Sequence, residues 1–200
     1  MADEVDLILA AWARELPGVD VTPLGSLSRL SRLARHLDRA RSEAFGAHGL
    51  EGWEFDVLAA LRRQGRPYEL SPGELIRATL STSGTMTNRV NRLEARGLVV
   101  RQPNADDRRG VLVRLTDEGR ERVEGALADL LAFERRVLAV VEPAERDALA
   151  GLLRRLLAPF EGLLEANDED EGGLELADVL EGGMRVALYA AWPVEAGALI

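Results

Sequence analysis

Apolar positions recur at three- and four-residue spacing over most of the chain, which is the spacing of one face of an α-helix. This periodicity predicts a short helix over residues 3–16 and longer ones over residues 24–46, 116–141 and from 142 onward. The predicted helix over residues 24–46 carries one apolar stripe, made of Leu27, Leu30, Leu33, Ala34, Leu37, Ala40 and Ala44. The predicted helix from residue 142 onward carries another, made of Leu149, Leu152, Leu153, Leu156, Leu157, Phe160 and Leu164.

The middle of the chain has shorter elements with clear boundary signals. Helices are predicted over residues 53–63, 74–80 and 83–96, and the second follows a capping box that begins at Ser71. Gly97 is placed to end the third helix as its C′ residue. Two β-branched runs, 98–102 and 111–115, flank a segment dense in turn residues and predict a β-hairpin. Helix, turn, helix and hairpin in this order are the layout of a winged helix-turn-helix.

The helix over residues 83–96 presents an unusual polar side. At about 100° per residue, Met86, Val90 and Leu93 fall on one face and must point to the core, and Arg89 lies at the edge of that face. The opposite side is small, polar and free of acids, which suits the major groove of DNA better than an ordinary solvent-facing helix. The candidate DNA-contacting residues are Ser83, Thr85, Thr87, Asn88, Asn91 and Arg92.

The tip of the predicted hairpin contains Asp107, Arg108 and Arg109. An arginine on an extended tip can enter the minor groove, where the negative potential favours it, and a preceding acid can hold its guanidinium. Taken alone, this string is also typical of a charged surface turn. Its position after the polar helix makes Arg108 and Arg109 candidate DNA contacts, with Asp107 as their support.

The charge is unevenly distributed. The net charge is -9, and residues 161–181 contain nine acids and no base, whereas residues 83–122 contain nine arginines against six acids. The chain has no cysteine and two histidines, His36 and His48, without carboxylates at ligand-like spacing, so thiol chemistry is excluded and metal catalysis has little support. The acids at 165–171 are interpreted as a solvated linker. We expect no enzymatic activity, no cofactor and no metal.

The residues around the polar helix and the hairpin carry a resemblance to a known family. Residues 83–89, 93–99 and 107–119 resemble the MarR family of bacterial transcription regulators, and the similarity extends over roughly residues 24–164. The resemblance implies an obligate homodimer, built by the N- and C-terminal helices, that binds double-stranded DNA at a palindromic operator with half-sites about one helical turn apart. By position, Thr85, Asn88 and Arg92 would contact the major groove and Arg109 the minor groove.

A second resemblance concerns sensing. The extra N-terminal helix is similar to that of a MarR subgroup that responds to urate and related anions. Trp12, Asp56, Arg89 and Arg101 occupy the positions of that subgroup's ligand residues. Asp56 could pair with Arg89, and a small anionic ligand would then compete for the arginine and release the DNA. The alternative is that Asp56 and Arg89 form a structural ion pair and that Trp12 is part of the core.

The expected fold is mainly α with a small β-hairpin wing, a winged helix-turn-helix with a helical dimerisation domain. We expect N-terminal helices over 1–46 that take part in dimerisation and ligand binding, a DNA-binding domain over 47–119, dimerisation helices over 120–165 and an acidic tail over 166–200. The acidic N-terminus and the lack of a long apolar run indicate a soluble, cytoplasmic protein without membrane contact. The alternative function is a helical protein-interaction module that does not bind DNA.

Overall fold

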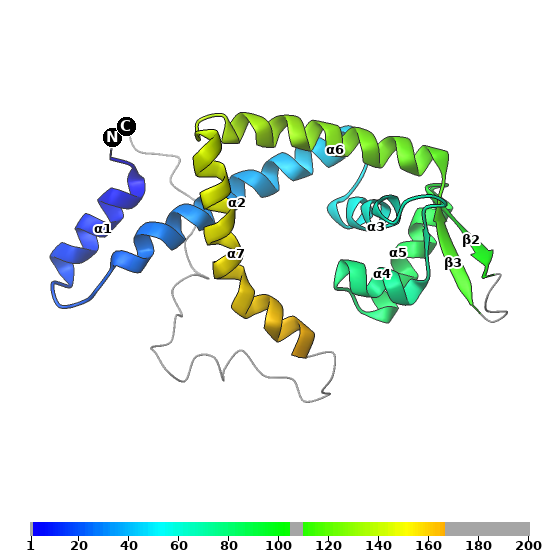
Figure 1. The fold of residues 1–200 in the computed structure, drawn as a ribbon, viewed down its shortest axis with the longest axis horizontal. Helices are drawn as coiled ribbons and strands as arrows, with labels where there is room; N and C mark the ends of the chain where they lie inside the picture. Colours follow the sequence, from blue (N-terminus) through cyan, green and yellow to red (C-terminus); the bar gives the residue numbers. More distant parts are fainter. Residues whose placement is uncertain (1, 105–109, 167–200) are drawn as a thin grey trace, which may run out of the picture. The chain divides into compact units, whose positions relative to one another are not determined.

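The computed structural model describes residues 2–104 and 110–166 of the chain. The chain divides into two compact units between Val140 and Val141. The first unit contains all the described elements but one, and the second contains the helix α7 (Pro143–Ala166) (Figure 1).

The first unit is helical with one small sheet, which confirms the expected fold class. Its helices begin and end within about three residues of the predicted limits, and its elements are α1 (Glu4–Glu15), α2 (Thr22–Ala47), α3 (Gly52–Arg63), β1 (Glu69–Leu70), α4 (Pro72–Thr79), α5 (Ser83–Ala95), β2 (Val99–Pro103), β3 (Val111–Leu115) and α6 (Asp117–Leu138). None of the helices in the described part of the chain is both long and apolar enough to cross a membrane.

The predicted hairpin is present and belongs to a three-stranded antiparallel sheet in the order β1-β3-β2. β2 and β3 pair from Val99 opposite Leu115 to Pro103 opposite Val111. The third strand, β1, pairs Glu69 with Arg114 and was not predicted. Two residues are too few to give an alternating pattern, so nothing in the local sequence marks this strand.

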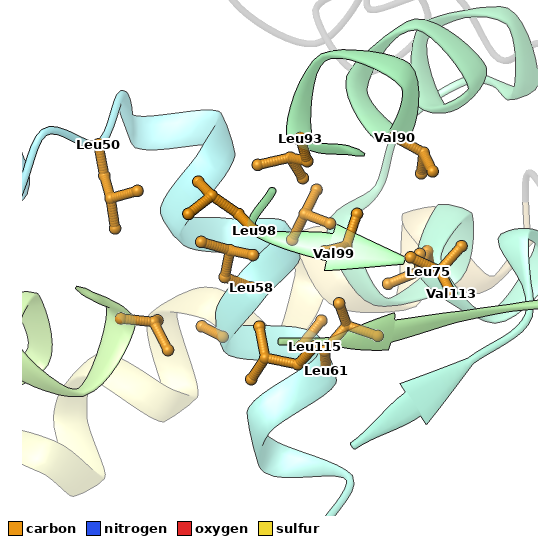
Figure 2. Close-up of a cluster of buried hydrophobic side chains, with 14 of the residues drawn as sticks. Leu50, Leu58, Leu61, Leu75, Val90, Leu93, Leu98, Val99, Val113 and Leu115 are labelled. Atoms are coloured by element: carbon orange, nitrogen blue, oxygen red, sulfur yellow. The ribbon is translucent and has the colours of Figure 1, made fainter. Parts of the chain in front are cut away.

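A single apolar core joins α3, α4, α5 and the hairpin (Figure 2). Leu58 and Leu61 of α3, Leu93 of α5, Leu98 before β2 and Val113 of β3 have no exposed surface. Burying one such side chain contributes roughly 1.5–3 kcal/mol. The core therefore fixes α5 against α3 and the hairpin, which is the arrangement that a winged helix-turn-helix requires.

Local signals in the sequence explain where α5 and α6 begin. Thr82 accepts a hydrogen bond from the amide of Thr85 at 3.4 Å, and Thr116 accepts one from the amide of Gly119 at 3.0 Å. Each is an N-cap that satisfies an amide of the first helical turn. The chain leaves α5 through Gly97, whose φ of 71° lies in the left-handed region that favours glycine.

The long helices carry the predicted leucine stripes, and these stripes are largely exposed. On α2, which packs against α1 and α6, Leu27 is 51% exposed, and Leu30 and Leu33 are exposed as well. On α7, the described residues Leu152, Leu156, Leu157 and Phe160 are exposed. Rows of exposed leucines on a chain of this size are candidate interaction surfaces.

Candidate DNA-binding site

The helix α5 has the two faces that the sequence predicts. Met86, Val90 and Leu93 are at most 2% exposed, and Arg89 is half-buried at the edge of the same face. The polar set on the other side is exposed, and it consists of Ser83, Thr85, Thr87, Asn88, Asn91 and Arg92. The core therefore holds the helix from behind and leaves this set open on the surface.

Four side chains of α5 border a shallow hollow of about 230 Å³ whose other wall is Trp53 of α3. The four are Thr85, Asn88, Arg89 and Arg92. Hydroxyl, amide and guanidinium groups are the ones that hydrogen-bond to base edges and phosphates. The hollow thus gathers the chemistry of nucleic-acid recognition on one side of the unit.

Arg92 is held by the first turn of α3. Its guanidinium lies 4.6 Å from the centre of the Trp53 ring and donates a hydrogen bond of 2.8 Å to Glu51. The indole Nε1 of Trp53 donates to the other oxygen of the same carboxylate at 2.7 Å. The indole hydrogen bond, followed by the charge of Arg92, lowers the pKa of Glu51 below its ordinary value.

Arg96, the C-cap residue of α5, is also tied to α3, here through a buried acid. It pairs with the carboxylate of Glu54, which has no exposed surface, and donates to the Gly49 carbonyl at 2.6 Å. The same carboxylate oxygen accepts a hydrogen bond from the Glu51 amide at 3.0 Å. Its second oxygen is buried without a hydrogen-bond partner. A buried carboxylate that depends on one arginine makes the position of α5 sensitive to this pair.

Arg101 of β2 links the hairpin to α5. It pairs with Glu94 and donates a hydrogen bond of 2.6 Å to the side-chain oxygen of Asn91. The predicted ligand residue Arg101 and the predicted DNA contact Asn91 are therefore neighbours. The tip of the hairpin, with Asp107, Arg108 and Arg109, lies outside the described residues.

The four predicted ligand residues are not joined to one another. Asp56 is exposed on α3 and borders a hollow with Arg63, whereas Arg89 lies 5.7 Å from the centre of the Trp53 ring. The pair between Asp56 and Arg89 that the sequence suggested is not formed: within the described part of the chain, no ion pair links these two residues. Trp12 is 41% exposed on α1, so it is not a core residue of the first unit.

Sequence reasoning missed Glu51, Glu54 and the contact of Trp53 with the arginines. Two acids at the first turn of α3 and two arginines at the end of α5 were visible, but their pairing depends on tertiary packing. His48 is the C-cap residue of α2 and forms a 2.8 Å contact with Asp129. Among residues 2–104 and 110–166, no group of three histidine or acidic side chains is arranged to hold a metal ion.

Comparison with known proteins decides the family. Residues 48–110 match the model described as the MarR family. The regulator PecS of Dickeya dadantii is 37% identical over 153 residues, which cover 76% of this chain and 92% of PecS. The chain belongs to the MarR family. It is a DNA-binding transcription regulator with a winged helix-turn-helix and not an enzyme, since its named relatives are transcriptional regulators.

Solved structures of known proteins share the fold. A mutant MarR of Escherichia coli in complex with operator DNA is 26% identical, has a TM-score of 0.56, and the match covers 73% of this chain and 97% of the other. YusO of Bacillus subtilis is 27% identical with a TM-score of 0.55, and the match covers 70% of this chain and 99% of YusO.

Proposed function

We propose that this MarR-family protein is a homodimeric repressor that reads a palindromic operator through α5 and is released from it by a small anionic metabolite. The observation that carries the reading of DNA is the exposed, acid-free set of polar side chains on α5, held from behind by Met86, Val90 and Leu93. Each part of the proposal has its own support.

The polar face of α5 fits the major groove by its chemistry. The amide of Asn88 can pair with an adenine edge, and the hydroxyls of Ser83, Thr85 and Thr87 suit phosphates or bases. Arg92 supplies a guanidinium for guanine or phosphate, and Asn91 an amide beside Arg101. From the sequence, Arg108 and Arg109, supported by Asp107, would add minor-groove contacts at the wing tip.

Dimerisation is supported by the exposed leucines of α2 and α7. Leu27, Leu30 and Leu33 follow one another along α2 at three-residue spacing, and Leu152, Leu156 and Phe160 recur at four-residue spacing on α7. A second copy of the chain would remove both rows from water. Two reading helices related by a two-fold axis would then favour a palindrome.

Repression is proposed from two relatives that are named as repressors. NicR of Pseudomonas putida is 29% identical, and the match covers 89% of its length. YetL of Bacillus subtilis is 25% identical, and the match covers 84% of its length.

Release by an anion is proposed from the residues that match the urate-responsive subgroup, Trp12, Asp56, Arg89 and Arg101. Among the described contacts, Arg89 has Trp53 and no acidic partner, so its charge is available to an anion. Titration of urate, citrate and trans-aconitate against a complex of the protein with its operator tests this part. If none of these anions changes the affinity, the four residues have no such role.

The reading of DNA is tested by selecting bound fragments from random double-stranded DNA and measuring the affinity of Asn88→Ala for them. We expect loss of one good amide–base pair to weaken operator binding by about ten-fold or more. Asp147→Ala, an exposed change on α7, is the matched control and should bind normally. If no sequence is selected and the residual binding does not depend on salt, the helical interaction module becomes the better interpretation.

A further inference from the structure

The first turn of α3 touches the reading face of α5 at one exposed point. Glu51, the residue before α3, and Trp53 both contact Arg92, which lies on the polar side of α5. Neither residue belongs to the helix-turn-helix face that the sequence predicted to contact DNA. Trp53 also lies 5.7 Å from the guanidinium of Arg89, whereas the described hydrogen bond from the polar side of α5 to Glu51 comes from Arg92.

The three side chains form a closed set of interactions. One carboxylate oxygen of Glu51 accepts from Trp53 at 2.7 Å, and the other accepts from Arg92 at 2.8 Å. The Arg92 guanidinium lies 4.6 Å from the indole centre, within the range of a cation–π contact. Trp53 is thus fixed by Glu51, and the two together fix the plane and the position of the guanidinium.

The set leaves part of Arg92 available. Its described hydrogen bond uses one terminal nitrogen, and a guanidinium has five N–H donors. The remaining donors include those that form the fork by which arginine recognises guanine or a phosphate. A side chain that is already oriented loses less rotamer entropy when it binds, so the free protein presents Arg92 in a prepared state.

We propose that Glu51 and Trp53 are positioning residues that preset Arg92 for operator readout, so that they raise the preference for the operator over other DNA. This inference rests on the proposed reading of DNA by α5. The interaction lies on the surface, since the Glu51 and Arg92 side chains are each 58% exposed. An exposed pair adds little to folding stability, so its effect falls on recognition.

The charge of Glu51 gives the proposal a distinct signature. A carboxylate beside the reading face repels DNA phosphates, so its removal alone would strengthen binding to every sequence. A positioning role predicts a different result, because binding to non-operator DNA stays equal or rises while the preference for the operator falls. The ratio of the two affinities separates these effects.

The test compares Glu51→Ser, Glu51→Gln and Trp53→Leu with the unmodified full chain at one salt concentration. Serine is a preferred N-cap residue, so Glu51→Ser removes the carboxylate while it preserves the start of α3. We expect the ratio of operator to non-operator affinity to fall about five-fold in Glu51→Ser and Trp53→Leu, and less in Glu51→Gln, whose one side-chain oxygen can still accept one of the two hydrogen bonds.

Double variants show whether the effect passes through Arg92. In an Arg92→Ala background, Glu51→Ser should lower the ratio no further, because the side chain that it positions is absent. An unchanged ratio in Glu51→Ser, or an equal loss with and without Arg92, would overturn the proposal. Asn88→Ala is measured alongside: if it leaves the operator affinity unchanged, the reading of DNA by α5 fails instead.

Discussion

The buried pair between Arg96 and Glu54 makes a sharp prediction about stability. Substitution Arg96→Met keeps most of the aliphatic length of the side chain and removes its charge. The Glu54 carboxylate has no exposed surface. In the variant it would lose its cation and keep, among the described residues, the backbone amide of Glu51 at 3.0 Å as its hydrogen-bond donor.

The expected cost follows from the burial of the acid. Removing one partner of a buried ion pair costs about 3–5 kcal/mol, because the other charge stays buried and uncompensated. The Arg96 side chain is itself 35% exposed, so solvent already screens part of the pair. We therefore expect the free energy of unfolding to fall by about 3 kcal/mol, the lower end of that range.

Urea unfolding, followed by circular dichroism at a fixed protomer concentration, measures this loss. The double variant Arg96→Met with Glu54→Gln should be more stable than Arg96→Met alone, because the second change removes the orphaned charge. Arg92→Met is the matched control, since Arg92 also pairs with an acid of α3 but at the surface, and it should change stability far less. The reasoning would be refuted if the stability losses of Arg96→Met and Glu54→Gln simply added in the double variant. It would also be refuted if Arg92→Met and Arg96→Met lost equal stability.

Two further predictions concern α6. An alanine at position 119 would place its Cβ 2.2 Å from the Leu98 carbonyl oxygen, so Gly119→Ala should destabilise the fold by about 2–3 kcal/mol in thermal unfolding. The control is Gly46→Ala, which has no neighbour within 4 Å of the added Cβ and should not destabilise the fold. The Arg62 guanidinium lowers the pKa of Glu124 below 4.5, so the stability from this pair is complete above about pH 4.5 and is lost as the pH falls through the lowered pKa. Arg62→Met should therefore reduce the stability difference between about pH 6 and pH 3, and an unchanged difference would contradict this assignment.

The features that sequence reasoning predicted correctly are those that local periodicity determines. The two faces of α5 follow from a repeat of about 3.6 residues, so the burial of Met86, Val90 and Leu93 could be predicted within one helix. The cap at Ser71 is likewise set by residues three positions apart. The hairpin follows from two β-branched runs and the turn between them.

The features that were missed or wrong are pairings between distant segments. Arg89 was correctly placed at the edge of the buried face, but its neighbour is Trp53 and not Asp56. With 25 basic and 34 acidic residues in the chain, local spacing cannot indicate which acid meets which arginine. The need for glycine at position 119 could not be predicted for a similar reason, because the backbone oxygen of Leu98 that excludes a side chain there comes from another segment.

The two contacts of α3 with α5 also limit how a ligand can act. Glu51 and Glu54 receive Arg92 and Arg96, so a ligand that moves α5 away from α3 must break the buried pair as well as the exposed one. Allosteric coupling energies are typically 1–3 kcal/mol, which is no more than the expected cost of breaking the buried pair alone. A ligand that weakens DNA binding would therefore move α3 and α5 together, or disturb Arg92 and its neighbours at the surface. Under either mechanism, we expect the contact between Arg96 and Glu54 to be kept when the protein is released from DNA.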